Sequence, residues 1–342
     1  MKKLIALLAV LMMVISVVSG CAQPAAEEAA ATTEATTAEA TTEEATTEEA
    51  TQKPVGELKI GIVMKSSDEF QNAVVQGAKD AAIEAGIPEA NFSAVASTSE
   101  SDAMQQVTAI EDMVANGIDI LLNACQEENS LKGALQAAAD AGVTVVMVDT
   151  DCQSFTDKVT FIGTDNYEAA YTGAQEFAKR LEAGSNVVIL RGKLGDVNHE
   201  KRTEGLTAAL EEAGMNVLEA QDANCETDKA AAAMEAFLTK YPGQIDAVMV
   251  TSDSMAVGAA QAIKSAGVEG IKICGFDGFQ SAIQLVKTGE IEMIIAQQPY
   301  QMGYQGVNDA LAAMYDGKTF DSYIKMGIAV IDSTNYQDYI AK

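Results

Sequence analysis

The chain has no tryptophan, one histidine and five prolines among its 342 residues. Aromatic residues make up 5% of it and hydrophobic residues 48%, so its core must be built from Ala, Val, Ile, Leu and Met. It has no G-x-G-x-x-G turn and no G-x-x-x-x-G-K-[ST] loop, and a lone histidine supplies no nucleophile–base set. We therefore expect neither an enzyme nor a cofactor.

Basic residues are scarce. Lys and Arg number 22 against 50 Asp and Glu, which gives a formal net charge of −28. Binding a polyanion needs clustered Lys and Arg, and the sequence has no basic stripe. The composition excludes nucleic acid as a partner and favours a soluble monomer.

The five cysteines show no metal-ligand spacing, so we expect no metal site. One of them, Cys21, lies in the leader. Cys125 and Cys152 each follow a predicted strand by a few residues, and a disulfide between them is one hypothesis. The alternative is that Cys125, Cys152, Cys225 and Cys274 are four isolated small apolar side chains.

Only one long apolar run occurs, from Leu4 to Val18, and it is shorter than the roughly 20 residues of a membrane-spanning helix. Lys2 and Lys3 precede it and Val18-Ser19-Gly20-Cys21 ends it, a pattern typical of a secretory signal over residues 1–20. The last four residues resemble the bacterial lipobox, which implies lipidation of Cys21 and anchoring on the outer face of the bacterial cell membrane. The alternative is an ordinary secretory leader that ends by chance in Cys.

Residues 22–53 form a Thr/Glu/Ala repeat with eight Glu and no large apolar side chain. Such a segment has nothing to bury, so we predict that residues 21–56 are a lipidated Cys followed by a disordered tether.

From Leu58 onward, continuous Val/Ile/Leu runs alternate with amphipathic stretches, which is typical of parallel sheets covered by helices on both faces. The pattern predicts an α/β fold with two doubly wound lobes. In the first series we expect strands at 58–64, 92–97, 118–123 and 143–149, with helices at 70–85, 101–115 and 129–141. In the second we expect strands at 158–163, 186–192, 215–220, 245–251, 271–277 and 291–297, with helices at 166–182, 200–213, 227–240 and 253–266.

Ligands of open α/β sheets bind beyond the carboxyl ends of the strands. The polar residues at these ends are therefore the candidate site, and with two facing lobes both sets would meet in one cleft. They include Ser66 to Asp68, Asn123, Asp149 to Asp151, Thr164, Ser252, Asp253, Asp277 and Gln297.

Six segments at these strand ends resemble, in this order, the type I periplasmic binding proteins, and specifically their ribose-binding-like group of sugar receptors. They read Val-Asp-Thr-Asp (148–151), Ile-Gly-Thr-Asp-Asn (162–166), Arg-Thr-Glu-Gly (202–205), Thr-Ser-Asp-Ser-Met-Ala-Val-Gly (251–258), Gly-Phe-Asp-Gly (275–278) and Ala-Gln-Gln-Pro (296–299).

The resemblance implies two lobes joined by three crossovers, near 164–166, 296–299 and 326–329. The N-terminal lobe would comprise 57–164 plus about 298–328, and the C-terminal lobe 165–297 plus about 329–342. Closure of the lobes would trap a sugar held by residues at matching positions. Together with the strand-end candidates, the expected ligand-binding set is Asp68, Phe70, Asn123, Asp149, Asp151, Thr164, Arg202, Ser252, Phe276, Asp277 and Gln297.

The chain departs from the family pattern in its first loop, where Asn-Pro-Phe-Phe is replaced by Asp68-Glu69-Phe70-Gln71. The family pattern also has an Asp-Arg pair where this chain has Asp149-Thr150. The first replacement removes one aromatic ring, and the second removes one guanidinium. An unpaired buried carboxylate is costly, and these changes favour a neutral polyol, a pentose-like or modified sugar, or a ligand with an amine.

Other readings compete at single positions. We expect Asp253 to cap the helix that follows it and His199 to be an exposed loop residue. Lys65 and Lys193 are near strand ends, from which they could approach the cleft, but isolated lysines are usually solvated. Arg202 stands near the start of a helix, where a base is unfavourable for the helix dipole, which favours a pocket role. Phe276 and Asp277 are adjacent on a strand and point to opposite sides unless the strand has ended.

Taken together, the sequence predicts an extracytoplasmic solute-binding lipoprotein that delivers a monosaccharide or related polyol to the permease subunits of an ABC importer. The alternatives are a receptor that feeds a sensor or chemotaxis system, and a binder of a furanosyl signal of the autoinducer-2 type, a nucleoside or an amine.

Overall fold

The computed structural model describes residues 52–98 and 103–340. The predicted signal peptide, Cys21 and nearly all of the predicted tether lie outside these ranges. Residues 51–342 form one compact unit. Within the described ranges no helix is long and apolar enough to cross a membrane.

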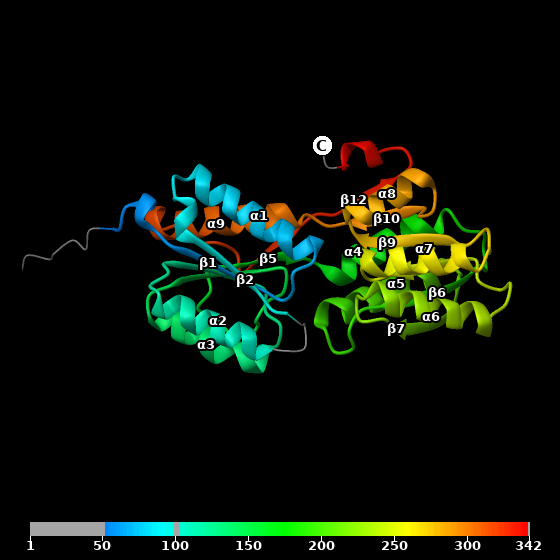
Figure 1. The fold of residues 1–342 in the computed structure, drawn as a ribbon, viewed down its shortest axis with the longest axis horizontal. Helices are drawn as coiled ribbons and strands as arrows, with labels where there is room; N and C mark the ends of the chain where they lie inside the picture. The colour runs from blue at the N-terminus through cyan, green and yellow to red at the C-terminus, as the bar shows by residue number, and fades with distance from the viewer. Residues whose placement is uncertain (1–51, 99–102, 341–342) are drawn as a thin grey trace, which may run out of the picture. The chain divides into compact units, whose positions relative to one another are not determined.

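The first sheet has six parallel strands in the order β11-β5-β4-β3-β1-β2. Helices α1 and α9 pack together over one face, and α2 and α3 cover the other (Figure 1). Buried Ile, Val, Leu and Met side chains fill both interfaces. The elements are β1 (Ile60–Met64), α1 (Glu69–Glu84), β2 (Phe92–Ala96), α2 (Ala103–Ala115), β3 (Ile120–Asn123), α3 (Glu128–Asp140), β4 (Thr144–Val148), β5 (Phe161–Thr164), α9 (Pro299–Asp316) and β11 (Tyr323–Met326).

The second sheet has the order β12-β10-β9-β8-β6-β7 and is parallel except for β12, which runs antiparallel to β10. One apolar cluster joins it to α4 and α5, and another joins its opposite face to α6, α7 and α8. The elements are α4 (Asn166–Ala178), β6 (Asn186–Arg191), α5 (Val197–Glu212), β7 (Asn216–Asp222), α6 (Thr227–Lys240), β8 (Ala247–Val250), α7 (Asp253–Ser265), β9 (Lys272–Asp277), α8 (Gln280–Thr288), β10 (Met293–Ala296) and β12 (Ala329–Asp332).

The chain passes between the two sheets three times. The passages lie between β5 and α4, between β10 and α9, and between β11 and β12. Each passage is only one or two residues long, so the two lobes are joined by three short neighbouring segments.

The α/β fold with two doubly wound lobes is confirmed, and each predicted strand and helix is present with its ends shifted by a few residues. Four elements were missed: α8, α9, β11 and β12. Helix α9 begins with Pro299 and carries Gly303 and Gly306, residues of low helix propensity. Its glycines serve packing, because a Cβ on Gly303 would lie 1.9 Å from the Val74 carbonyl oxygen of α1.

Candidate ligand-binding site

A small cavity lies where the carboxyl ends of strands from both sheets meet. Its volume is about 40 Å³, room for about three water molecules and far below the ~300 Å³ lower bound of common small-molecule pockets. A bound solute therefore has to displace side chains or separate the two lobes. The lining residues are Lys65, Asp68, Phe70, Gln71, Asp149, Asn198, His199, Arg202, Cys225, Ser252, Asp277 and Phe279.

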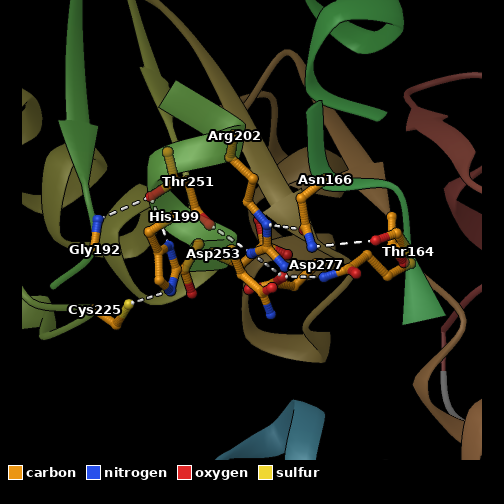
Figure 2. Close-up of polar contacts among 12 residues, drawn as sticks. Thr164, Asn166, Gly192, His199, Arg202, Cys225, Thr251, Asp253 and Asp277 are labelled. Atoms are coloured by element: carbon orange, nitrogen blue, oxygen red, sulfur yellow. Dashed lines mark hydrogen bonds and ion pairs between the residues drawn. The ribbon is translucent and has the colours of Figure 1, made fainter. Parts of the chain in front are cut away.

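Arg202 is the central cation of the second lobe. Its Nη1 donates to Asp277 Oδ1 at 2.9 Å and to the Thr251 carbonyl oxygen at 2.8 Å, and its Nε donates to Asn166 Oδ1 at 2.7 Å (Figure 2). The guanidinium carbon lies 4.2 Å from the centroid of the Phe276 ring. Four partners thus hold the guanidinium in one orientation, which fixes its position at the cavity wall.

Asp277 ends β9 with φ 119°. This backbone conformation is energetically unfavourable for any residue other than glycine, and residues held in such conformations are common at functional sites. Burial raises the pKa of its carboxyl to about 6, although Arg202 opposes that shift. Gln297 Nε2 also donates to Asp277 Oδ1, at 2.7 Å. The carboxylate is thereby oriented by two donors and held at the edge of the cavity.

Asp149 is the corresponding residue of the first lobe. It follows β4 with φ 61°, and its carboxylate accepts from Gln71 Nε2 at 3.1 Å and from Thr150 Oγ1 at 3.0 Å. Asn198 of α5, in the other lobe, donates to Asp149 Oδ1 at 3.4 Å and to Thr150 Oγ1 at 3.0 Å. Each lobe therefore contributes a buried carboxylate from a strand end of unusual backbone conformation.

Lys65 corrects an expectation of the sequence, because its side chain is buried rather than solvated. Its Nζ lies 3.4 Å from Asp149 Oδ2 and 3.4 Å from Asp196 Oδ2, carboxylates that belong to different lobes. Burial alone would raise the pKa of Asp196, but the Lys65 cation beside it holds that pKa below its usual range. Lys65 follows β1 directly, so its strand-end position was the informative signal, and the general tendency of isolated lysines to be solvated was not.

The position of His199 also differs from the sequence expectation. It lies within α5, only 8% of its surface is exposed, and it is not an exposed loop residue. Its Nδ1 is 2.9 Å from Thr251 Oγ1 and its Nε2 is 3.1 Å from Cys225 Sγ (Figure 2). Burial, with the nearby Arg202 cation, lowers the pKa of the imidazole to about 3, so the ring is neutral at physiological pH.

Thr251 and Cys225 contact the two nitrogens of that imidazole. Gly192 N donates to Thr251 Oγ1 at 2.9 Å, and the same hydroxyl of this fully buried threonine lies against His199 Nδ1. The other ring nitrogen, Nε2, lies against Cys225 Sγ. A continuous chain of hydrogen bonds thus fixes Cys225 at the cavity wall.

Asp253 does not cap its own helix, contrary to the sequence interpretation. Ser252 occupies the N-cap of α7, and the buried Asp253 carboxylate accepts from the backbone nitrogens of Gly278 and Phe279, each at 2.8 Å. Burial, together with the neighbouring Asp277 charge, raises the pKa of Asp253 well above its usual value. The residue fastens the loop between β9 and α8.

The structure brings only part of the expected ligand-binding set to this cavity. The members that line it are Asp68, Phe70, Asp149, Arg202, Ser252 and Asp277. Gln297 is not a lining residue, but its side chain donates a hydrogen bond to Asp277. Phe276 has no exposed surface and lies beneath Arg202 instead of presenting its ring to the cavity.

Three further members of the set lie elsewhere. Asn123 is fully buried and its Nδ2 donates to the Val63 carbonyl oxygen at 3.0 Å. Asp151 pairs with Lys158 at 2.7 Å, and it lines, together with Thr164, a separate depression beside the β5–α4 passage. The sequence reasoning missed Gln71, Asn198, His199, Cys225 and Phe279, and it left Lys65 out of the expected set.

Cys125 and Cys152 are neighbours, as the strand-end argument expected, and the Cys125 backbone nitrogen donates to the Thr150 carbonyl oxygen at 3.0 Å. Both residues are free thiols, so the hypothesis of a Cys125–Cys152 disulfide is wrong. They hydrogen-bond each other, and this contact together with burial raises the pKa of Cys125. In residues 52–98 and 103–340, no group of three or more His, Cys, Asp and Glu side chains is arranged to hold a metal ion.

Chemically, the cavity offers carboxylate acceptors and guanidinium, ammonium and amide donors within a few ångströms of one another. Such sets bind small solutes with several hydroxyl groups, since each hydroxyl both donates and accepts.

Comparison with known proteins agrees with this geometry. The model of the periplasmic binding protein domain matches residues 60–319. The D-ribose/D-allose-binding protein of Pseudomonas aeruginosa is 32% identical over 262 residues, which cover 74% of this chain and 81% of that protein. The ribose import binding protein of Escherichia coli is 28% identical over 219 residues, 64% of this chain and 73% of that protein.

Among solved structures, a periplasmic solute-binding protein of an ABC transporter from Actinobacillus succinogenes, with bound D-allose, superposes with a TM-score of 0.77. It is 26% identical, and the match covers 82% of this chain and 100% of that one. The family model spans most of the chain, and the two-lobed α/β fold agrees with it. The chain therefore belongs to the periplasmic binding protein family, in its type I, ribose-binding-like group.

Proposed function

We propose that this protein captures a neutral monosaccharide or related polyol between its two lobes and presents it to the permease of an ABC importer. The observation that carries the proposal is the convergence of two buried carboxylates, Asp149 and Asp277, from opposite lobes on one cavity. Lys65 and Arg202 hold these carboxylates in place. A ring or chain of hydroxyl groups inserted between them would accept from the bases and donate to the acids.

The charges of the cavity support a solute without negative charge. Asp68, Asp149 and Asp277 line it against Lys65 and Arg202, and His199 is neutral. Each of the two bases is already within 3.4 Å of a carboxylate. A sugar acid or sugar phosphate would have to compete with these partners and would meet unfavourable acidic potential.

Relatives support the same class. The relatives are named as binding proteins for D-ribose/D-allose and ribose, and a protein from Mycolicibacterium smegmatis that is 28% identical over 70% of this chain is named as a xylitol-binding protein. Cyclic and open-chain polyols therefore both belong in a ligand screen.

We further propose that the mature protein begins at Cys21, carries lipid there and acts as a monomer on the outer face of the cell membrane. The leader sequence supports the anchor, and the net charge of −28 supports the monomer. Metabolic labelling with an alkyne fatty acid would test it: the wild type should be labelled and Cys21→Ser unlabelled. Label on the Cys21→Ser variant would contradict the anchor.

A thermal-shift screen tests the binding function. A ligand that binds only the folded state stabilises it by RT ln(1 + [L]/Kd), about 2.7 kcal/mol at 100 times Kd. We expect D-ribose, D-allose, xylitol or a related neutral compound to raise Tm, and gluconate and ribose 5-phosphate to leave it unchanged. If amino acids or sugar acids shift Tm and no neutral sugar or polyol does, the assignment is wrong.

A further inference from the structure

We propose that Phe279 is an aromatic lid over the solute cavity and that Glu69 locks it across the two lobes. The inference rests on the proposed function and adds the residue that supplies the apolar face of the site. That face is not supplied by Phe276, which is buried beneath Arg202.

The position of Phe279 supports a lid. It belongs to the second lobe, immediately before α8, and it lines the cavity together with Phe70 of the first lobe. Its side chain is partly buried and packs against the apolar clusters of both lobes. A ring in that place covers the cavity only while the lobes lie together.

Glu69 supplies the lock. Phe279 is the N-cap residue of α8 and has no side-chain group that could satisfy the free backbone nitrogens of that helix end. Glu69, on α1 of the first lobe, accepts instead from the Gln280 backbone nitrogen at 2.7 Å and from Ser281 Oγ at 3.0 Å. A carboxylate of one lobe thus caps a helix of the other, where the helix dipole favours negative charge.

The base of the lid is held independently of Glu69. The Asp253 carboxylate accepts from the Gly278 and Phe279 nitrogens at 2.8 Å each, from within the second lobe. Gly278 has φ +98°, a conformation that favours glycine. The lid therefore moves as part of the second lobe, and opening of the lobes breaks the Glu69 hydrogen bonds and the packing of Phe279 on the first lobe.

The two residues should affect binding differently. Glu69 makes contacts only with the protein, so it acts as a positioning residue and should alter the lifetime of every bound solute by the same factor. Phe279 faces the solute and packs on C–H surface, so its contribution should depend on whether the solute is a ring or an open chain.

The first experiment needs no ligand. Hydrogen exchange of the peptide containing residues 279–283 should be faster by about fivefold in Glu69→Ala than in the wild type, because the cap is worth roughly 1 kcal/mol. Glu84→Ala is the matched control, since Glu84 lies on the same helix and bonds Tyr304 instead. Equal exchange in the wild type and Glu69→Ala would overturn the lock.

The second experiment measures dissociation rates of D-ribose, D-allose and xylitol by stopped flow. Phe279→Ala should release solutes about tenfold faster, and Phe279→Leu should change the ratio between D-ribose and xylitol. Phe92→Leu, at the opposite, amino end of a strand, is the control and should change neither. Glu69→Ala should accelerate release of all three equally.

Unchanged rates and ratios in the Phe279 variants would overturn the lid. If the wild type binds none of the three compounds while the exchange result is as expected, the proposed ligand class is contradicted and the lock across the lobes stands.

Discussion

Arg202 Nη1 lies 2.9 Å from Asp277 Oδ1, and both side chains are almost completely buried. A buried ion pair adds little net stability, but removing one partner leaves an uncompensated charge that costs about 3–5 kcal/mol. Single and double substitutions of the pair should therefore differ clearly in their free energies of unfolding.

Arg202→Met should destabilise the protein by about 3 kcal/mol or more in urea unfolding. Arg202→Met/Asp277→Asn should recover a substantial part of that loss, since no charge is left unpaired. Arg191→Met is the control, because the Arg191–Asp222 pair is partly exposed, and it should cost less than about 1 kcal/mol. If the loss in the double variant equals the sum of the losses in Arg202→Met and Asp277→Asn, the two residues are not coupled and the account is contradicted.

The single histidine provides a spectroscopic test. Burial holds the pKa of His199 at about 3, so its ring proton signals should not titrate between pH 8 and pH 4. Proton NMR of untagged protein checks this directly, since only one imidazole can contribute. A midpoint near 6.5 would show that His199 is exposed.

The same shift predicts a pH dependence of stability. Between pH 6.5 and pH 3 the unfolded chain binds a proton at His199 that the folded chain does not, so the free energy of unfolding contributed by this group falls as pH falls. Asp277 has the opposite sign, because its raised folded-state pKa of about 6 favours folding at lower pH. In urea unfolding from pH 7 to pH 4, His199→Gln should lose less stability than the wild type and Asp277→Asn should lose more.

Lys65 joins carboxylates of both lobes, so Lys65→Met should leave Asp149 and Asp196 without their shared cation. We expect a loss of about 2–4 kcal/mol in unfolding free energy and weaker solute binding. Lys201→Met is the matched control, since Lys201 pairs with Glu204 at the surface, and it should change stability by less than about 0.5 kcal/mol. Equal effects of the two substitutions would contradict the buried role of Lys65.

The contact between α1 and α9 depends on glycine. A Cβ on Gly77 would lie 1.9 Å from the Tyr300 carbonyl oxygen, so Gly77→Ala must push the helices apart and should cost about 2 kcal/mol or more. Gly133→Ala in α3 is the control, since nothing lies within 4 Å of its added methyl, and it should be neutral or stabilising by up to about 1 kcal/mol. Urea unfolding of both variants distinguishes them.

The sequence predicted the two-lobed α/β fold because alternating apolar runs and helical stretches are a local signal. It missed α8 and α9 because their local signals are weak. Helix α8 is short and its N-terminus is capped by Glu69 from the other lobe, a contact that no local pattern encodes.

Strand position led the sequence interpretation to Asp149 and Asp277, and the start of a helix led it to Arg202; all three line the cavity. The errors concern burial and pairing. His199 and Lys65 were expected to be solvated because lone polar residues usually are, but each is buried against partners that lie at least 26 positions away in the sequence. Asp253 illustrates the same point, since its hydrogen bonds reach the loop after β9 and not its own helix.

The most direct test of the account is isothermal titration calorimetry of residues 52–342 with D-ribose, D-allose, xylitol and, as the anionic control, gluconate. We predict saturable one-to-one binding of at least one neutral compound by the wild type, and no detectable binding by folded Asp277→Asn. Binding of gluconate in preference to all neutral compounds, or unchanged affinity in Asp277→Asn, would contradict the proposed function.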